Sequence, residues 1–141
     1  MKGLFPVFRE QLANFRLNAA WVGYSWDVES TDTNRAGVAI RNLASGRKRT
    51  APALVGNQWA TQLVNRLAVN PKGDIAWVGD GWLSGPPVTS PQGRQILVLD
   101  GSDQRAQLLD EGLDILPRSV TIGRSAVHWT DSEGPHQFPF S

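Results

Sequence analysis

Short stretches of alternating apolar and polar residues, separated by turn-forming residues, run along most of the chain. In residues 12–17 and 38–43 the apolar side chains fall largely on every second position. A period of two is typical of a β-strand that buries one face. Residues 95–100 are instead almost continuously apolar, which indicates a strand covered on both faces. The pattern therefore predicts many short strands.

Turn-forming residues separate these predicted strands. Gly46 supplies the positive φ that a hairpin bulge requires, and Asn70-Pro71-Lys72-Gly73 has the composition of a β-turn. The predicted strands are 12–17, 20–26, 38–43, 48–55, 62–69, 74–78, 95–100, 104–109, 118–122, 126–130 and 137–140. Polar loops are expected at 27–35 and 83–93, further turns at 101–103 and 123–125, and a linker at 110–117. Residues 58–65 have near-helical spacing, but their β-branched and apolar content favours a strand.

One tryptophan-rich segment recurs along the chain. Residues 20–26 read Ala-Trp-Val-Gly-Tyr-Ser-Trp, and residues 76–82 read Ala-Trp-Val-Gly-Asp-Gly-Trp, with five of the seven positions identical. A weaker copy surrounds Trp129. A period of about 50 residues is typical of architectures in which each repeat is one small sheet. We therefore expect a single β-repeat domain over residues 1–141, with repeats at about 12–57, 58–112 and 113–141, the last incomplete.

The order of elements within a repeat is strand, turn, tryptophan-bearing strand, loop, strand, glycine turn, strand. This order resembles the four-stranded blade of bacterial β-propeller-type (WD40-like) repeat proteins. The segments that carry the resemblance are 67–78, 40–47 and 119–129. It implies an all-β fold of tandem antiparallel four-stranded sheets that form a partial β-propeller. It implies no particular activity, because propellers serve as binding modules, scaffolds and enzymes.

Two repeats and part of a third are too few for a closed propeller, which has at least four blades. An open fan would leave apolar sheet faces and strand edges in water and would promote association. Three alternatives follow from this. The chain is a fragment of a longer one, several copies complete a ring, or the sheets fold on one another as a β-sandwich.

Composition and charge exclude several classes of function. The chain has no cysteine, so disulfides, thiolate metal sites and cysteine nucleophiles are excluded. Its formal charge is +1, which implies no steering toward nucleic acid. No apolar run approaches the length of a membrane-spanning helix, and residues 1–10 do not have the pattern of a signal peptide. We expect no nucleic-acid partner and no membrane span, and the compartment stays open.

Trp26 and Trp82 are the leading candidates for a binding site. Each stands where a predicted strand gives way to a long loop, close to Tyr24 in the first repeat and Asp80 in the second. Two indoles at one end of a fan offer a platform for a sugar ring or a peptide. The alternative is that both rings cap their sheets and pack on a neighbour. The other strand tryptophans, Trp21, Trp77 and Trp129, are expected in the core.

Three polar clusters contain residue types that occur in metal, calcium or nucleic-acid sites. The spacing of His128, Asp131 and His136 matches no recognised ligand pattern, so we expect solvated or hydrogen-bonded histidines and no metal. The acidic loop of Asp27, Glu29 and Asp32 lacks the spacing of a calcium site. The basic hairpin of Arg41, Arg47, Lys48 and Arg49 lacks interleaved aromatic residues and is expected to be a solvated turn. No G-x-S-x-G motif supports serine hydrolysis.

The sequence therefore favours a non-catalytic binding or assembly module without a cofactor. Its expected partner is a protein, including another copy of the chain, or a glycan, bound by the loops after Trp26 and Trp82. A fragment of a propeller hydrolase or lyase is one alternative. A purely structural repeat is the other.

Overall fold

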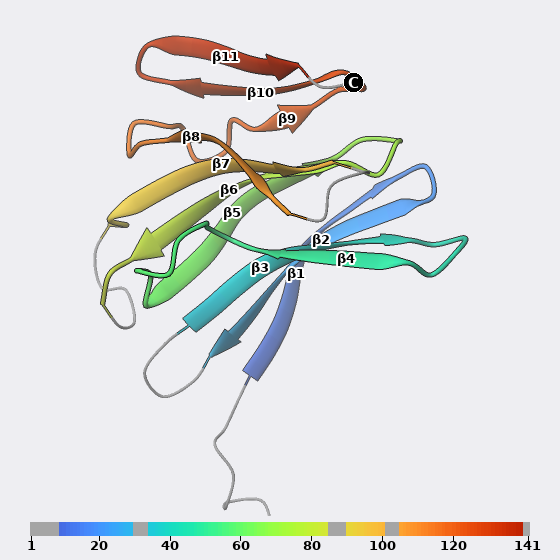
Figure 1. The fold of residues 1–141 in the computed structure, drawn as a ribbon, viewed down its shortest axis with the longest axis horizontal. Coiled ribbons are helices and arrows are strands. Elements are labelled where there is room, and N and C mark those ends of the chain that lie inside the picture. The colour runs from blue at the N-terminus through green and yellow to red at the C-terminus, as the bar shows by residue number, and fades with distance from the viewer. Residues whose placement is uncertain (1–8, 30–33, 85–89, 101–104, 140–141) are drawn as a thin grey trace, which may run out of the picture.

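The computed structural model describes residues 9–29, 34–84, 90–100 and 105–139. These residues form eleven β-strands and no helix (Figure 1). None of them therefore belongs to a helix capable of crossing a membrane. Within each sheet consecutive strands are antiparallel, so the fold is all-β, as the alternating pattern predicts.

The first sheet consists of four consecutive strands. They are β1 (Arg9–Asn18), β2 (Trp21–Glu29), β3 (Asn34–Asn42) and β4 (Lys48–Pro52), each antiparallel to the next. The β1–β2 turn is very short, and Ala19 adopts a φ of 53° to close it. The β3–β4 turn contains Gly46 with a φ of 77°, which confirms the glycine turn expected there.

The second sheet repeats this order. Its strands are β5 (Thr61–Val69), β6 (Ile75–Trp82), β7 (Gly93–Leu99) and β8 (Gln107–Glu111). Gly73 has a φ of 90° in the turn between β5 and β6, as the Asn-Pro-Lys-Gly composition predicts. One parallel pair, Asn34 with Thr61, links β3 of the first sheet to β5 of the second.

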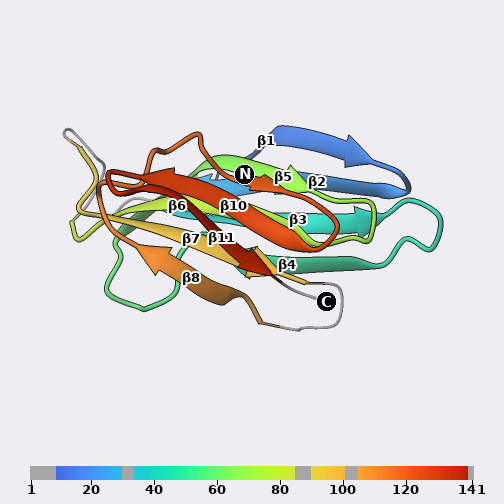
Figure 2. The ribbon, with the colours of Figure 1, turned by 90° about the horizontal axis from the view of Figure 1, so that it is seen from above.

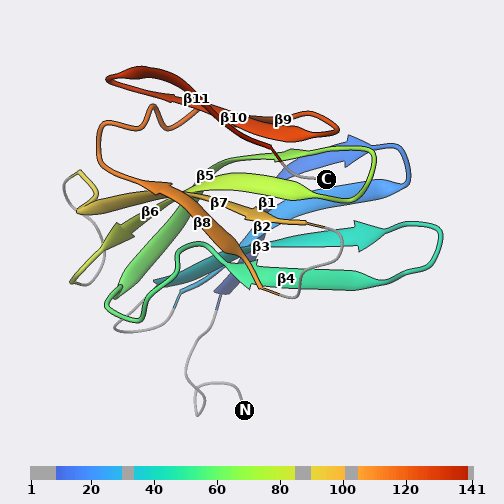
Figure 3. The ribbon, with the colours of Figure 1, turned by 45° about the horizontal axis from the view of Figure 1, so that its top comes forward.

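The third sheet has three described strands. They are β9 (Thr121–Ile122), β10 (Ala126–Asp131) and β11 (Gly134–Pro139). Figures 1 and 3 show the sheets stacked in sequence order, with the second sheet between the first and the third. Seen from above, β10 and β11 lie across the second sheet (Figure 2). The arrangement is a fan of three sheets, as in part of a β-propeller.

Two apolar cores hold the fan together, one on each face of the second sheet. The core shared with the first sheet contains Ala36, Val38, Ile40, Ala51, Ala53, Leu54, Val64, Leu67, Val69, Ile75, Trp77, Leu97 and Leu99. The core shared with the third sheet contains Ala76, Val78, Ile96, Val98, Ile115, Val120, Val127 and Trp129. Successive residues of β6 and β7 alternate between these cores. The strand predicted at 95–100 is therefore covered on both faces.

Several predicted boundaries are wrong. The loop expected at 27–35 is shorter, because β2 continues to Glu29 and β3 begins at Asn34. The linker expected at 110–117 begins later, since β8 includes residues 110 and 111. The strand expected at 118–122 comprises only Thr121–Ile122. Residues 61–65 of the window with near-helical spacing are strand. The turn expected at 101–103 lies outside the described residues.

The two copies of the recurring segment lie on the second strand of their respective sheets, but their first tryptophans point in opposite directions. Trp21 in β2 and Trp77 in β6 both pack into the core between the first and second sheets. Trp21 thus faces the following sheet, whereas Trp77 faces the preceding one. Trp129 in β10 also faces its preceding sheet. Side chains along a strand alternate between its two faces, so moving a residue by one position along the strand turns its side chain to the opposite face. By the direction of its side chain, Trp77 therefore corresponds to Trp129 and not to Trp21.

Indole hydrogen bonds support this match between Trp77 and Trp129. The Nε1 atom of Trp77 donates to the carbonyl of Ala53, just after the last strand of the preceding sheet, at 3.0 Å. The Nε1 atom of Trp129 donates to Asp110, on the last strand of its preceding sheet, at 2.8 Å. Both indoles fasten one sheet to the outer edge of the sheet before it.

Candidate functional site

Tyr24 and Trp26 lie on the face of the first sheet that points away from the second. Their register partners Ala39 and Gly37 alternate with Val38 and Ile40, which point into the core. We define the apolar first-sheet face as the side chains on this outward side: Leu12, Phe15, Leu17, Val22, Tyr24, Trp26, Val28 and Ala39. Part of it forms a hollow of about 270 Å³ with Lys48 and Thr50 at its border.

Aromatic packing orders this face. The rings of Phe15 and Tyr24 are stacked, with centroids 5.4 Å apart. The indole of Trp26 lies directly over Gly37, where a Cβ atom would come within 2.4 Å of the ring. Its Nε1 atom donates to the carbonyl of Val38 at 3.2 Å. Trp26 is therefore a half-buried part of its own sheet with its ring held against the backbone.

Trp82 lies in different surroundings. Its side chain is almost buried, with 7% exposed, and it lines a second hollow of about 320 Å³ together with Gln11, Asp27 and Glu29 of the first sheet. Burial, with a smaller contribution from Glu29, raises the pKa of Asp27. Trp26 and Trp82 thus line separate hollows and do not form one joint platform.

Asp80 is part of a buried ion pair. Its Oδ1 atom is 2.6 Å from Nε of Arg94, and Nη2 of Arg94 is 3.3 Å from Oδ2. Asn65 also donates to this carboxylate. The other terminal nitrogen of Arg94 donates to the carbonyl of Ile115, in the segment that leads to the third sheet, at 2.9 Å. Asp80 thus lies in a contact between the second and third sheets, with only 5% of its side chain exposed.

A further hollow lies between the first and second sheets, and the sequence did not indicate it. Its volume is about 620 Å³, within the range of small-ligand pockets. It is lined by Arg35, Thr50, Ala51, Pro52, Leu54, Val55, Gly56, Asn57, Trp59, Ala60, Gln62, Arg105 and Ala106. We call it the Trp59 hollow. The described lining contains no carboxylate and no imidazole.

Trp59 forms one wall of this hollow. Its ring lies against Gly81 and Gly93, where Cβ atoms would meet it at 2.5 and 2.2 Å, and its Nε1 atom donates to the carbonyl of Val55 at 3.1 Å. Arg35 and Arg105 are exposed at the border. The Oε1 atom of Gln62 is buried without a hydrogen bond among the described atoms. An apolar floor and two cations suit a ligand with an apolar body and a carboxylate, and the free acceptor suits an N–H or O–H donor of that ligand.

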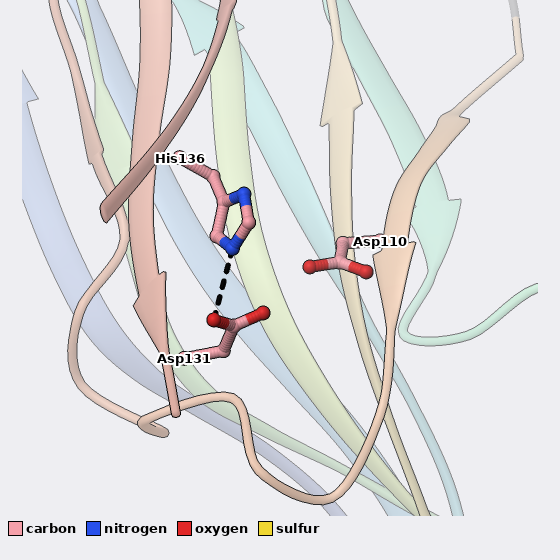
Figure 4. Close-up of side chains that lie close together, drawn as sticks. All are labelled: Asp110, Asp131 and His136. Carbon is pink, nitrogen blue, oxygen red and sulfur yellow. Dashed lines mark ion pairs between the residues drawn. The ribbon is translucent and has the colours of Figure 1, made fainter. Parts of the chain in front are cut away.

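A third group of polar side chains joins the second and third sheets. Asp110, Asp131 and His136 converge on one space (Figure 4). The Nε2 atom of His136 lies 2.9 Å from Oδ1 of Asp131. This interaction raises the pKa of His136 and lowers that of Asp131. Asp131 and His136 come together on one face of the tight β10–β11 hairpin, because His136 lies opposite Trp129 and Asp131 is two residues further along β10. His128, the third member of the candidate set, is exposed and lies apart.

The basic hairpin is only partly solvated. Arg41, Arg47 and Lys48 are exposed, as expected. Arg49 instead points into the fan, where its guanidinium donates to the carbonyl of Gly73 at 2.9 Å and to that of Asp100. Of the acidic loop, Asp27 and Glu29 belong to β2, and Asp32 lies outside the described residues.

Comparison with known proteins identifies the fold but no family. No family model matches the sequence, and no curated protein matches it. Two solved structures resemble the chain. One is Pyrococcus horikoshii acylaminoacyl peptidase, with a TM-score of 0.56 and 16% identity over 87% of this chain and 17% of that one.

The other is the β-propeller domain of the Trilobed protease from Pyrococcus furiosus, with a TM-score of 0.58 and 14% identity. The match covers 92% of this chain and 43% of that domain's chain. The chain thus spans less than half the length of either neighbour. At such identities the likeness concerns the fold alone. The chain therefore has an all-β fold of tandem antiparallel sheets that correspond to part of a β-propeller.

Proposed function

We propose that this chain is a non-catalytic assembly module, in which the apolar first-sheet face packs against the same face of a second copy. The observation that carries this proposal is the exposure of large apolar side chains on one face: Leu12 is 50%, Phe15 54% and Leu17 70% exposed. Monomeric soluble proteins rarely expose a contiguous apolar patch of this kind.

The internal packing of the fan supports an interface at this place. In the second sheet, Trp77 on β6 points at the first sheet. In the third sheet, Trp129 on β10 points at the second sheet in the same way. The first sheet directs Tyr24 and Trp26 outward in the same way, and no described residue of another sheet covers them. An apolar sheet face is therefore the kind of partner that this surface fits.

We expect the second copy to contact the apolar first-sheet face and not the outward side of the third sheet. The outward side of the third sheet carries His128, Thr130 and Gln137, which are polar and offer little apolar area. Contact between two first-sheet faces is self-complementary, and such two-fold interfaces are the commonest in homo-oligomers. The module would then be a dimer of two fans.

Light scattering over a range of protein concentrations tests this assembly. We expect a dimer for the wild-type chain and a monomer for the double variant Phe15→Glu/Leu17→Glu, because charges on both faces repel in the interface. The matched control is Leu113→Glu, which charges an exposed leucine away from this face. A wild-type chain that stays monomeric at all concentrations would overturn the proposal, as would a control that dissociates equally.

The Trp59 hollow favours a second candidate function, in which the chain is the propeller portion of a peptidase and receives a peptide end. Its apolar wall and the border cations Arg35 and Arg105 suit a free carboxyl terminus. The two structural neighbours are a peptidase and a protease, which agrees with this candidate.

Calorimetric titration with short apolar peptides, in free-acid and amidated forms, tests the second candidate. We expect the free acids to bind and Arg105→Gln to weaken binding about tenfold through loss of a charge-assisted hydrogen bond. Arg118→Gln, an exposed arginine outside the hollow, is the control. Equal binding of acids and amides, or none, would contradict a carboxylate site.

A further inference from the structure

We propose that Asp110, Asp131 and His136 form a zinc site that fastens the third sheet to the second. One ligand atom from each of these side chains lies within 4.8 Å of the others. Figure 4 shows both carboxylates and the imidazole directed at a common space. Two carboxylates and one imidazole are ligand types that zinc accepts, and three protein ligands leave a fourth position for water.

The Nε2 atom of His136 is directed at the shared space and is open to a metal ion. This atom is shielded from solvent and makes no well-directed hydrogen bond, although Asp131 Oδ1 is 2.9 Å away. A short contact without hydrogen-bond geometry is what two ligands of one metal ion show. For tetrahedral coordination the most distant ligand atoms must approach by about 1–1.5 Å, within reach of side-chain rotation.

Trp129 positions two of the three ligands. Its Nε1 atom donates to Oδ2 of Asp110 at 2.8 Å, and its ring is stacked on His136 with centroids 5.7 Å apart. Asp131 is held separately, because Oδ1 accepts the backbone N–H of Glu133 at 2.8 Å. Partners of this kind orient ligands in established zinc sites, and their loss weakens metal binding about 10–100-fold.

The charge of the cluster also favours a dication. On binding, the His136 imidazolium gives up its Nε2 proton to solvent, and the freed lone pair bonds to the metal while Nδ1 keeps its proton. The two ionised carboxylates and the resulting neutral imidazole carry a charge of −2, which Zn²⁺ neutralises. With a nitrogen ligand present, zinc is favoured over the oxygen-preferring ions Mg²⁺ and Ca²⁺.

Calorimetry with Zn²⁺ on the untagged, chelator-treated chain tests the site. We expect one saturable site per chain, at least tenfold weaker binding in Asp110→Asn and His136→Gln, and unchanged binding in His128→Gln, the exposed histidine on the same hairpin. Trp129→Phe should weaken binding about 10–100-fold. Zinc should also raise the melting temperature of the wild type but not of His136→Gln.

A measurement on the wild-type chain with Co²⁺ in place of Zn²⁺ does not depend on the folding of any variant. Co²⁺ should give visible absorption bands typical of tetrahedral coordination with nitrogen and oxygen ligands. The absence of saturable one-to-one binding by the wild type would overturn the proposal. So would a folded His136→Gln variant that binds zinc as tightly as the wild type, or loss of binding in His128→Gln.

Discussion

At the scale of single residues, close approach between sheets depends on glycines that face tryptophans or backbone. Gly79 in β6 lies against the first sheet's outer segment, where a Cβ atom would come within 2.2 Å of the Ala53 carbonyl oxygen. The same carbonyl accepts the indole N–H of Trp77. The small residue and the large one therefore act together: glycine lets the backbones approach, and the indole fills the adjacent space and satisfies the carbonyl.

Gly79→Ala is expected to destabilise the fold by about 1–3 kcal/mol, because the added methyl group meets a backbone atom that cannot rotate away. Urea unfolding of the variant measures the change in the free energy of unfolding. Gly123→Ala is the matched control, since its added Cβ would meet only one atom, 3.9 Å away. Equal stability of the Gly79→Ala variant and the wild type would show that the sheets are less tightly packed than described.

At the scale of elements, the turn between β5 and β6 connects the second sheet to the third. Asn70 is fully buried, and its Oδ1 atom accepts the backbone N–H groups of Lys72 and Asp74 at 3.0 Å. Its Nδ2 atom donates to the Asp74 carboxylate at 2.7 Å and to the carbonyl of Gly123 in the third sheet at 3.0 Å. One amide therefore closes the turn and holds a neighbouring sheet.

Asn70→Ala is expected to lower the free energy of unfolding by about 2–4 kcal/mol, because it leaves buried donors and acceptors without partners. Thermal and urea unfolding measure this loss. The exposed Asn57, replaced by alanine, is the control and should change stability by less than about 0.5 kcal/mol. A variant as stable as this control would mean that water replaces the amide in the turn.

At the scale of the whole molecule, the two flanks of the fan differ in chemistry. The first sheet presents exposed leucines and stacked aromatic rings, whereas the third presents polar side chains. The second sheet is covered on both faces and needs no partner. Association through the first sheet and zinc binding between the second and third therefore involve separate surfaces. Charges introduced at Phe15 and Leu17 should change the mass in solution without changing zinc affinity.

The candidate sites were less accessible to sequence reasoning than the fold. Tyr24 and Trp26 were identified as candidates and do share a surface, but Trp82 and Asp80 lie elsewhere, in a separate hollow and a buried ion pair. Trp59 and Asp110 were missed. Both residues contact side chains or backbone that are distant in the sequence. The spacing of residues along the chain does not indicate such contacts, because they form only when the chain folds.

The sequence by itself determined the strands and turns, because alternation with period two, the Asn-Pro-Lys-Gly turn and Gly46 act over a few residues. It also determined the tandem sheets, through the recurrence of a tryptophan-bearing strand. Only the tertiary structure decided which face each tryptophan occupies, since a shift of one residue in strand phase reverses the direction of every side chain. That is why nearly identical segments place Trp21 and Trp77 on opposite sides of one core.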